Sequence, residues 1–282
     1  MTRLGLGPIG VALTYGEWDA LLGAAPELEA MGYSTIWVSG GQLNDLNQIT
    51  ELARTTHNVP VGSAIIPVDR FPAKAVARTY AQLQETHPGR FIVGLGGAHG
   101  PRPLHTMGNY LDHLDTVPPN VPATTRMLAA LGPRMLELAR DRAAGALPLL
   151  MTPDYTAQAR KLLGEDATLV VEHHVVLETD PTRARQAARG VIGFLSGVTG
   201  YAKHFRRLGF AEEDVAQLSD RLVDALVVWG DLHTIGRRVA EHLEAGADQI
   251  ALVVLPTDGS IPVSTAQWRQ LAEALIPGRR LG

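Results

Sequence analysis

The sequence of 282 residues contains no cysteine. This absence excludes disulfide scaffolds, cysteine-ligated zinc or iron–sulfur centres and thiol nucleophiles, and it makes the cytoplasm the expected compartment. Aromatic residues are also scarce, at 5% of the chain, and charged residues reach only 19%. Hydrophobic residues nevertheless make up 45%, which is enough to bury a large core. We therefore expect one large soluble domain over residues 1–282.

The sequence has neither an excess of basic charge nor a long hydrophobic run. The 25 basic side chains against 29 acidic ones give a formal net charge of −4, and they form no basic block. Neither nucleic acid nor an anionic membrane is therefore an expected partner. The apolar stretch 4–13 is interrupted by glycines and a proline and lacks a signal-peptide cleavage site, and no other run approaches the length of a membrane span.

Short apolar runs alternate with longer segments of helical periodicity, a rhythm typical of a parallel sheet covered by helices. Eight candidate strands in a chain of this length favour an α/β fold of the closed (β/α)₈ TIM barrel type over an open doubly wound sheet. Apolar stripes over 212–229 and 231–245 predict a helical insertion before the eighth strand. The candidate strands are residues 4–11, 35–39, 59–66, 91–96, 127–131, 146–151, 168–177 and 249–255.

Helix signals fall between these strands. An apolar stripe predicts a helix over 18–28, which Pro26 is expected to break or kink. Proline at the first helical position predicts four further helix starts, and the capping-type residues Thr152 and Asp180 precede two of them. These prolines are Pro72, Pro133, Pro153 and Pro181.

The fourth candidate strand ends in glycines, at Gly94, Gly96 and Gly97. The third glycine of a dinucleotide-binding fingerprint would fall at position 99, which is His99, so that fingerprint is absent. Glycines at the mouth of a barrel would let a flat ring approach the backbone. They are equally typical of a turn that needs positive φ.

A Gly-Pro-Arg sequence follows the fifth candidate strand. Pro133 is expected to open a helix, so free N–H groups around Gly132, Arg134 and Met135, together with the Arg134 charge, would form an anion site. A lone Gly-Pro is more often an ordinary turn between a strand and a helix. Both interpretations stay open from the residues alone.

The histidines give no metal motif. His173 and His174 are adjacent on a strand and point to opposite faces, whereas Glu172 and His174 share one face. We expect that pair to be a buried ion pair or a satisfied core histidine. The remaining histidines, His99 among them, are spaced too irregularly for a metal site. No nucleophile elbow, Walker loop or H-E-x-x-H is present, which disfavours serine hydrolases, P-loop enzymes and zincins.

In this order and at this spacing, several short segments resemble the luciferase-like monooxygenase superfamily, specifically its branch of deazaflavin (coenzyme F420)-dependent oxidoreductases. The resemblance covers nearly the whole chain. The segments that carry it are residues 32–37 (GYSTIW), 61–65 (VGSAI), 87–96 (HPGRFIVGLG), 130–136 (ALGPRML), 177–185 (LETDPTRAR) and 245–250 (AGADQI).

The resemblance implies where a cofactor would bind. The deazaflavin ring would lie at the C-terminal mouth of the barrel, backed by a bulge with a non-prolyl cis peptide at Ala64–Ile65. The phosphate of its tail would lie near the helix after the fifth strand. The resemblance therefore favours the anion-site interpretation over that of an ordinary turn. The expected cofactor-binding residues are Ser39, Gly40, Ala64, Ile65, Gly96, Gly97, Leu131, Gly132, Pro133, Arg134 and Met135.

The sequence also departs from that family. Related enzymes that oxidise sugar phosphates and alcohols carry an Asp-His pair after the second strand, where this chain has Ser39-Gly40-Gly41. A carboxylate that they often carry beyond the fourth strand is replaced by His99. Alcohol oxidation is therefore disfavoured, and His99 is the expected catalytic acid or base, because imidazole titrates near neutral pH. A loop histidine that simply faces solvent is the alternative.

The expected function is F420-dependent hydride transfer between the deazaflavin C5 and a small unsaturated or carbonyl-containing substrate. Two alternatives stay open. One is an FMN-dependent luciferase-like monooxygenase, and the other is a deazaflavin-binding protein without turnover. The expected partner is a small-molecule substrate, and the resemblance allows a homo-oligomer.

Overall fold

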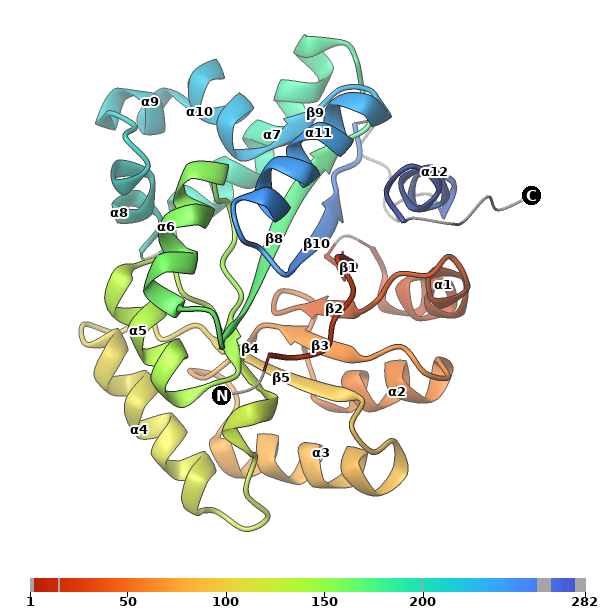
Figure 1. Ribbon diagram of the computed structural model, residues 1–282, viewed down its shortest axis with the longest axis vertical. Helices are drawn as coiled ribbons and strands as arrows, with labels where there is room; N and C mark the ends of the chain where they lie inside the picture. The colour runs from red at the N-terminus through yellow and green to blue at the C-terminus, as the bar shows by residue number, and fades with distance from the viewer. Residues whose placement is uncertain (1–2, 15, 199, 258–264, 277–282) are drawn as a thin grey trace.

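The computed structural model describes residues 3–14, 16–198, 200–257 and 265–276. At its centre, eight parallel strands close into a barrel, because the order β10-β1-β2-β3-β5-β6-β7-β8 is completed by pairing of β8 with β10 (Figure 1). The fold is therefore a TIM barrel, as predicted. These strands are β1 (Ile9–Leu13), β2 (Ile36–Ser39), β3 (Val61–Ala64), β5 (Phe91–Gly96), β6 (Arg126–Leu128), β7 (Gly145–Ala146), β8 (Thr168–Val176) and β10 (Gln249–Val254).

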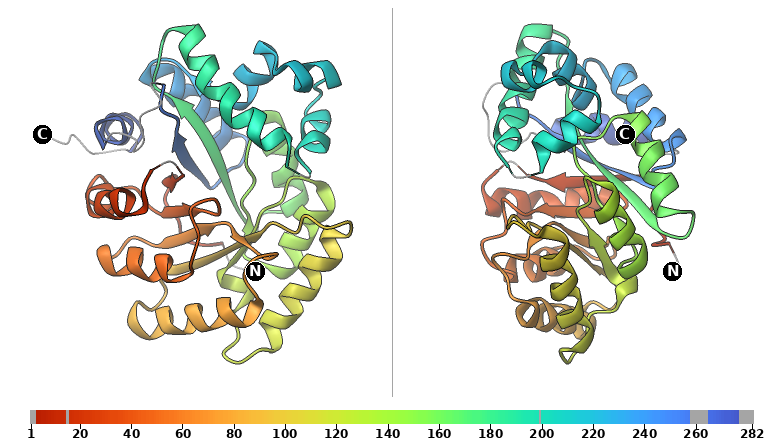
Figure 2. Two further views of the ribbon diagram at one scale, coloured as in Figure 1. Left: turned by 180° about the vertical axis from the view of Figure 1, so that it is seen from behind. Right: turned by 90° about the vertical axis from the view of Figure 1, so that its left-hand side faces the viewer.

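Helices surround the barrel, as the two further views show (Figure 2). Two short strands, β4 (Ile66–Pro67) and β9 (Val228–Trp229), extend the sheet beside β5 and β8, and a 3₁₀ turn covers Ala123–Thr125. The helices are α1 (Trp18–Ala30), α2 (Asn47–Thr55), α3 (Ala73–Thr86), α4 (Pro103–Thr116), α5 (Pro133–Arg142), α6 (Pro153–Leu163), α7 (Pro181–Ser196), α8 (Tyr201–Arg207), α9 (Glu212–Gln217), α10 (Asp220–Leu226), α11 (Leu232–Glu244) and α12 (Thr265–Leu275).

Each of the eight expected strands has a counterpart, with differences at the ends. The first begins at Ile9, where the register with β10 starts, because Pro8 has no N–H and only its carbonyl accepts from Ile250, at 2.8 Å. The third is divided between β3 and β4 at the Ala64–Ile65 peptide. The sixth shrinks to two residues, because Pro148 follows it and Leu150 has φ 55°, so a single bridge from Leu149 to Glu172 continues the pairing.

The expected helix starts hold at Pro133, Pro153 and Pro181, and the Thr152 and Asp180 side chains accept the N–H groups of Tyr155 and Arg183. Pro72 instead adopts an extended conformation as the N-cap of α3, so that helix starts one residue later.

The predicted break at Pro26 is wrong, because α1 continues to Ala30. The missing proline N–H costs one intrahelical hydrogen bond. Ala25 and Leu28, on either side of Pro26, are completely buried, and this packing outweighs that cost.

The predicted helical insertion before the eighth barrel strand is present. It comprises α8, α9 and α10 with the short strand β9, and it lies between α7 and α11 (Figure 1). The stripe over 212–229 is divided in three, because Leu218 adopts a left-handed conformation and Ser219 caps the next helix.

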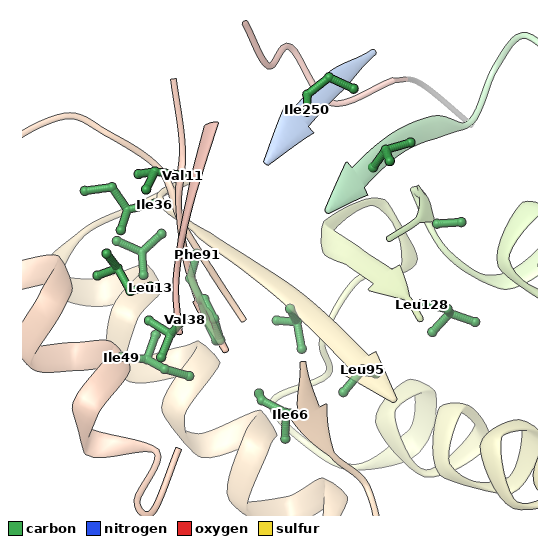
Figure 3. Packing of buried hydrophobic residues seen from close by; sticks show 14 of the residues in the cluster. Val11, Leu13, Ile36, Val38, Ile49, Ile66, Phe91, Leu95, Leu128 and Ile250 are labelled. Atoms are coloured by element: carbon green, nitrogen blue, oxygen red, sulfur yellow. The ribbon is translucent and has the colours of Figure 1, made fainter. Parts of the chain in front are cut away.

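Strand residues alternate between two buried layers. Outward-facing residues pack against the helices, as Val11, Val38, Leu95 and Leu128 do in Figure 3. Inward-facing residues such as Trp37 fill the barrel, where the Trp37 indole N–H donates to Gln249 Oε1 at 2.9 Å. This alternation sets which strand residues face the interior at the mouth of the barrel.

Candidate functional site

The rim of the mouth begins where β2 and β3 end. Ser39 pairs with Ala64, and the Gly40 N–H donates to the Ala64 carbonyl at 3.1 Å. The peptide bond between Ala64 and Ile65 is cis, as predicted. A Cβ at position 40 would lie 2.5 Å from the Ile65 carbonyl oxygen, so the two segments touch backbone to backbone. The structure thus brings Ser39, Gly40, Ala64 and Ile65 together.

The next part of the rim is the glycine pair after β5. A Cβ at position 96 would lie 2.7 Å from Ile65 Cγ1 and 2.9 Å from the Ala129 Cβ. Glycine at this position therefore leaves the space that the Ile65 side chain occupies. Gly97 has a φ of 75°, a conformation that favours glycine. Gly97 therefore agrees with the turn that needs positive φ, Gly96 is needed for packing against Ile65, and the approach of a flat ring to this backbone stays a prediction.

His99 lies just beyond Gly97 and has a carboxylate partner. Its Nδ1 lies 3.0 Å from Asp69 Oδ2, and its backbone N–H donates to the same oxygen at 3.1 Å. The His99 side chain is 51% exposed and that of Asp69 is 38% exposed. The two contacts hold the ring near Gly97 while half of it remains open to solvent, so His99 is not simply a free loop side chain.

The fifth strand leads to the start of α5, where a second arginine is found. A Cβ at Gly132 would lie 3.2 Å from the Arg207 guanidinium carbon, so Arg207, at the end of α8, lies against the first turn. Its Nη1 donates to the Leu131 carbonyl at 3.3 Å, and the Tyr155 hydroxyl donates to the same carbonyl at 3.0 Å. Arg207 belongs to the inserted helices, which thereby reach the predicted anion site.

The donors at this helix start differ from the prediction in one respect. The Met135 N–H is not free, because it donates to the Gly132 carbonyl at 3.0 Å and tightens the first turn. Pro133, at the first helical position, has no N–H to offer. The Arg134 side chain is exposed in the first turn of α5, the turn against which Arg207 lies at Gly132.

The expected pairing of Glu172 with His174 is wrong. In the part of the chain that the structure describes, no ion pair or hydrogen bond joins the two side chains, and His174 Nδ1 is buried without a partner. Residues two apart on one strand face are separated by about 7 Å, and nothing bends these side chains together. Burial raises the pKa of Glu172 to about 8 and lowers the pKa of His174 to about 3.

No metal centre is seen among the described residues, which hold no group of three or more histidine and carboxylate side chains suited to one. Within the same ranges, no helix has the length and apolarity needed to cross a bilayer.

Comparison with known proteins agrees with this geometry. Residues 5–116 match the family model described as luciferase-like monooxygenase. The luciferase-like resemblance is confirmed. No curated protein sequence matches the chain.

Solved structures share the barrel fold over almost the whole chain. An F420-dependent secondary alcohol dehydrogenase, solved with an F420–acetone adduct, is 15% identical with a TM-score of 0.72, covering 98% of each chain. The coenzyme F420-dependent tetrahydromethanopterin reductase of Methanopyrus kandleri is 17% identical with a TM-score of 0.74, covering 97% of this chain and 99% of its own.

An FMN complex is also among these structures. The oxygenating constituent of a 3,6-diketocamphane monooxygenase from Pseudomonas putida is 13% identical with a TM-score of 0.65, covering 96% of this chain and 97% of its own. At such identities these likenesses establish the fold, and they do not select between F420 and FMN.

Three residues of this candidate site escape sequence reasoning. Asp69 lies 30 positions before its partner His99, and no local pattern links them. Arg207 closes a short helix, where a basic residue is expected in any case. Tyr155 carries no motif of its own. Only the path of the chain around the barrel brings these side chains to the rim.

Proposed function

We propose that this protein binds reduced coenzyme F420 and passes hydride from its C5 to a small unsaturated or carbonyl-containing substrate. The observation that supports this most is the His99–Asp69 pair beside the glycine-rich rim, since reduction of such a substrate needs a proton source next to the ring. The solved F420-dependent neighbours have the same barrel.

The residues present fit a planar, polar ring with an anionic tail. Thr14 Oγ1, just after β1, is buried without a partner among the described residues, and such an atom is available to a polar ring edge. Ser39, Gly40, Gly96 and Gly97 bring short side chains and backbone to the rim.

The tail would be held at α5. Leu131, Gly132 and Pro133 set the turn, and Arg134 and Arg207 supply two positive charges to an anion such as a phosphate. Met135 would contribute its side chain, since its N–H is already used.

The chain's own contribution to the chemistry is binding, orientation and proton supply. When bound, the reduced cofactor supplies the hydride. Asp69 accepts the Nδ1–H of His99, which fixes the tautomer and leaves Nε2 as the nitrogen that exchanges a proton with the substrate. Ser39-Gly40-Gly41 offers no base at the end of β2, so the direction that this site favours is reduction rather than alcohol oxidation.

Titration with both cofactors tests this proposal. We expect coenzyme F420 to bind more tightly than FMN, with an affinity that falls as salt is raised, because the tail is polyanionic. Absorbance would then follow oxidation of the reduced deazaflavin as candidate enones and ketones are added. Tight FMN binding without measurable F420 binding would favour the monooxygenase instead, and F420 binding without turnover of any substrate would favour the binding protein.

A further inference from the structure

The barrel interior contains an acidic and an imidazole side chain that the proposed chemistry does not use. Glu172 and His174 are 6% and 2% exposed, on the inward side of β8. Val170 and Val176 on the same side pack in the inner apolar layer, whereas Val171 and Val175 face the outer one. These two polar residues therefore replace apolar ones in a layer that is otherwise closely packed.

Their neighbours across the sheet are apolar. Glu172 is in register with Ala251 on β10 and bridges to Leu149 on its other side, and His174 is in register with Val253. Leu149 lies in the segment that follows the short strand β7, whereas Glu172 is the fifth of the nine residues of β8 and Ala251 the third of the six residues of β10. Glu172 therefore lies in the middle of the barrel, and His174 lies two residues nearer to the C-terminal ends of the strands, where sites in this fold are found.

The side-chain polar atoms of the pair have no hydrogen-bond partner among the described residues. Across the described ranges, neither the Glu172 carboxyl nor the His174 ring makes a hydrogen bond, although the Glu172 backbone N–H donates to Pro148 at 2.9 Å. Buried polar groups are almost always satisfied in folded proteins. We explain a pair left unsatisfied inside the barrel by a ligand that completes it.

Tyr201, the first residue of α8, is the third polar group. Burial raises the pKa of its hydroxyl, and the nearby Glu172 carboxyl raises it further. Among the described residues, no further titratable group is found to act on Glu172: its neighbours on β10 and after β7 are apolar, and His204 on α8 contacts the Leu150 carbonyl at 2.8 Å.

The cluster is uncharged at neutral pH. With a pKa of about 8, Glu172 is mostly a carboxylic acid, which donates one hydrogen bond, while His174 is a neutral imidazole. No arginine or lysine pairs with the cluster among the described residues, so an anionic ligand has no counter-charge here. A carbonyl oxygen is the acceptor that this set of donors suits.

We propose that Glu172, His174 and Tyr201 bind the carbonyl oxygen of an uncharged substrate inside the barrel. This inference rests on the proposed function, whose broader substrate class it narrows to neutral carbonyl compounds. The carboxyl of Glu172 donates to the oxygen, and His99 at the rim remains the proton donor. Carboxylates and phosphates are then poor substrates.

Ligand-observed saturation-transfer NMR tests the site directly, with 2-cyclohexen-1-one as the neutral probe and cyclohexanecarboxylate as the anionic one. Wild type should bind the enone and not the carboxylate. Glu172→Leu should weaken enone binding at least tenfold, whereas Glu172→Gln, which keeps a donor, should bind it well. The control is Glu178→Gln, because Glu178 follows the same strand but pairs with Arg183.

The pH dependence gives a second measurement that needs no variant. Enone affinity in wild type should fall about tenfold between pH 7 and pH 9 as the carboxyl ionises. In Glu172→Gln it should stay constant. Equal binding by Glu172→Leu and wild type, preference for the carboxylate, or a wild-type affinity independent of pH would each overturn the inference.

The same titrations are made with and without coenzyme F420, which separates the two proposals. If F420 fails to bind but enone affinity depends on Glu172, the proposed cofactor is wrong and the carbonyl site stands. If F420 binds, and enone affinity does not depend on Glu172 either with or without F420, the carbonyl site is wrong and the proposed function stands.

Discussion

His99 Nδ1 lies 3.0 Å from Asp69 Oδ2, and that oxygen also accepts the His99 backbone N–H. Two bonds to one carboxylate oxygen fix both the ring and the backbone of a residue on a glycine-rich loop. Such an arrangement selects one tautomer and holds the opposite nitrogen, Nε2, toward a reactant. A histidine that served only solubility would need no such partner.

His99→Ala should lower turnover about 10²–10⁴-fold, which is the usual contribution of a positioned acid or base. Asp69→Asn should cause a smaller loss, because the imidazole remains but its tautomer is no longer fixed. Cofactor affinity should change little in either variant. Steady-state kinetics with a reducible substrate and a separate cofactor titration give the two readouts.

His105→Ala is the matched control, since His105 is an exposed histidine on α4 that contacts only Asn109 among the described residues. Its kinetics should match wild type. Turnover near wild type in His99→Ala would show that the proton comes from elsewhere, and Glu172 would be the next residue to vary.

Arg134→Ala and Arg207→Ala should each weaken cofactor binding by about 1–2 kcal/mol, the range of one charge-assisted hydrogen bond. The double variant should lose more than either single variant, and its affinity should depend less on salt than that of wild type. Isothermal titration at two salt concentrations measures both effects.

Arg140→Ala provides the control for this pair. Arg140 lies in the last turn of the same helix and pairs with Asp141, far from the Gly132 end. Unchanged affinity in Arg207→Ala at low salt would mean that its contact with Gly132 is only structural.

Gly96→Ala should destabilise the fold by about 1–3 kcal/mol, the range for an overpacked core. The new Cβ would meet Ile65 Cγ1 at 2.7 Å and the Ala129 Cβ at 2.9 Å. Adding Ile65→Ala removes the first conflict, so the double variant should lose less stability than the sum of the single ones. Urea unfolding measures all three.

The control is Gly100→Ala, because a Cβ at that position meets nothing within 4 Å. Its free energy of unfolding should stay within about 0.5 kcal/mol of wild type. A Gly96→Ala variant as stable as wild type would indicate that the rim is looser than these contacts imply.

The barrel could be predicted from the sequence because its strands are apolar on both faces and its helices begin with proline or a capping side chain. β5 agrees with its predicted range at both ends, since its six residues are all buried. Pro26 misled the prediction because local propensity favours a break, whereas the burial of its neighbours is a property of the whole fold.

The site was less accessible to sequence reasoning. The cis peptide at Ala64–Ile65 could be expected from the resemblance to a known family, and the helix start at Pro133 from the proline itself. The contacts of Asp69 and Arg207, and the lack of a partner for Glu172, depend on which side chains meet across the barrel. A strand sequence says that Glu172 and His174 share a face, and it does not say what lies opposite them.

Another buried pair lies on the outward side of the same strand. The rings of His173 and His242 are 4.7 Å apart between centroids, His173 has no hydrogen-bond partner in the described residues, and His242 Nδ1 lies 2.9 Å from the Thr156 hydroxyl. Burial lowers the pKa of both, to about 3 for His242, from an ordinary value of 6.5.

These two histidines should make the fold sensitive to acid. Below pH 6.5 the unfolded chain binds protons that the folded chain excludes, so the free energy of unfolding falls as pH decreases below 6.5. His242, whose pKa is lowered to about 3, should account for about 2 kcal/mol between pH 7 and pH 5, and the lowered pKa of His173 should add to this loss. His173→Leu, which removes one site, should reduce that pH dependence, while His105→Gln, at an exposed position, should leave it unchanged. Urea unfolding of the three proteins at pH 5, 6 and 7 measures the slopes, and an equal slope in wild type and His173→Leu would mean that His173 is not held neutral by burial.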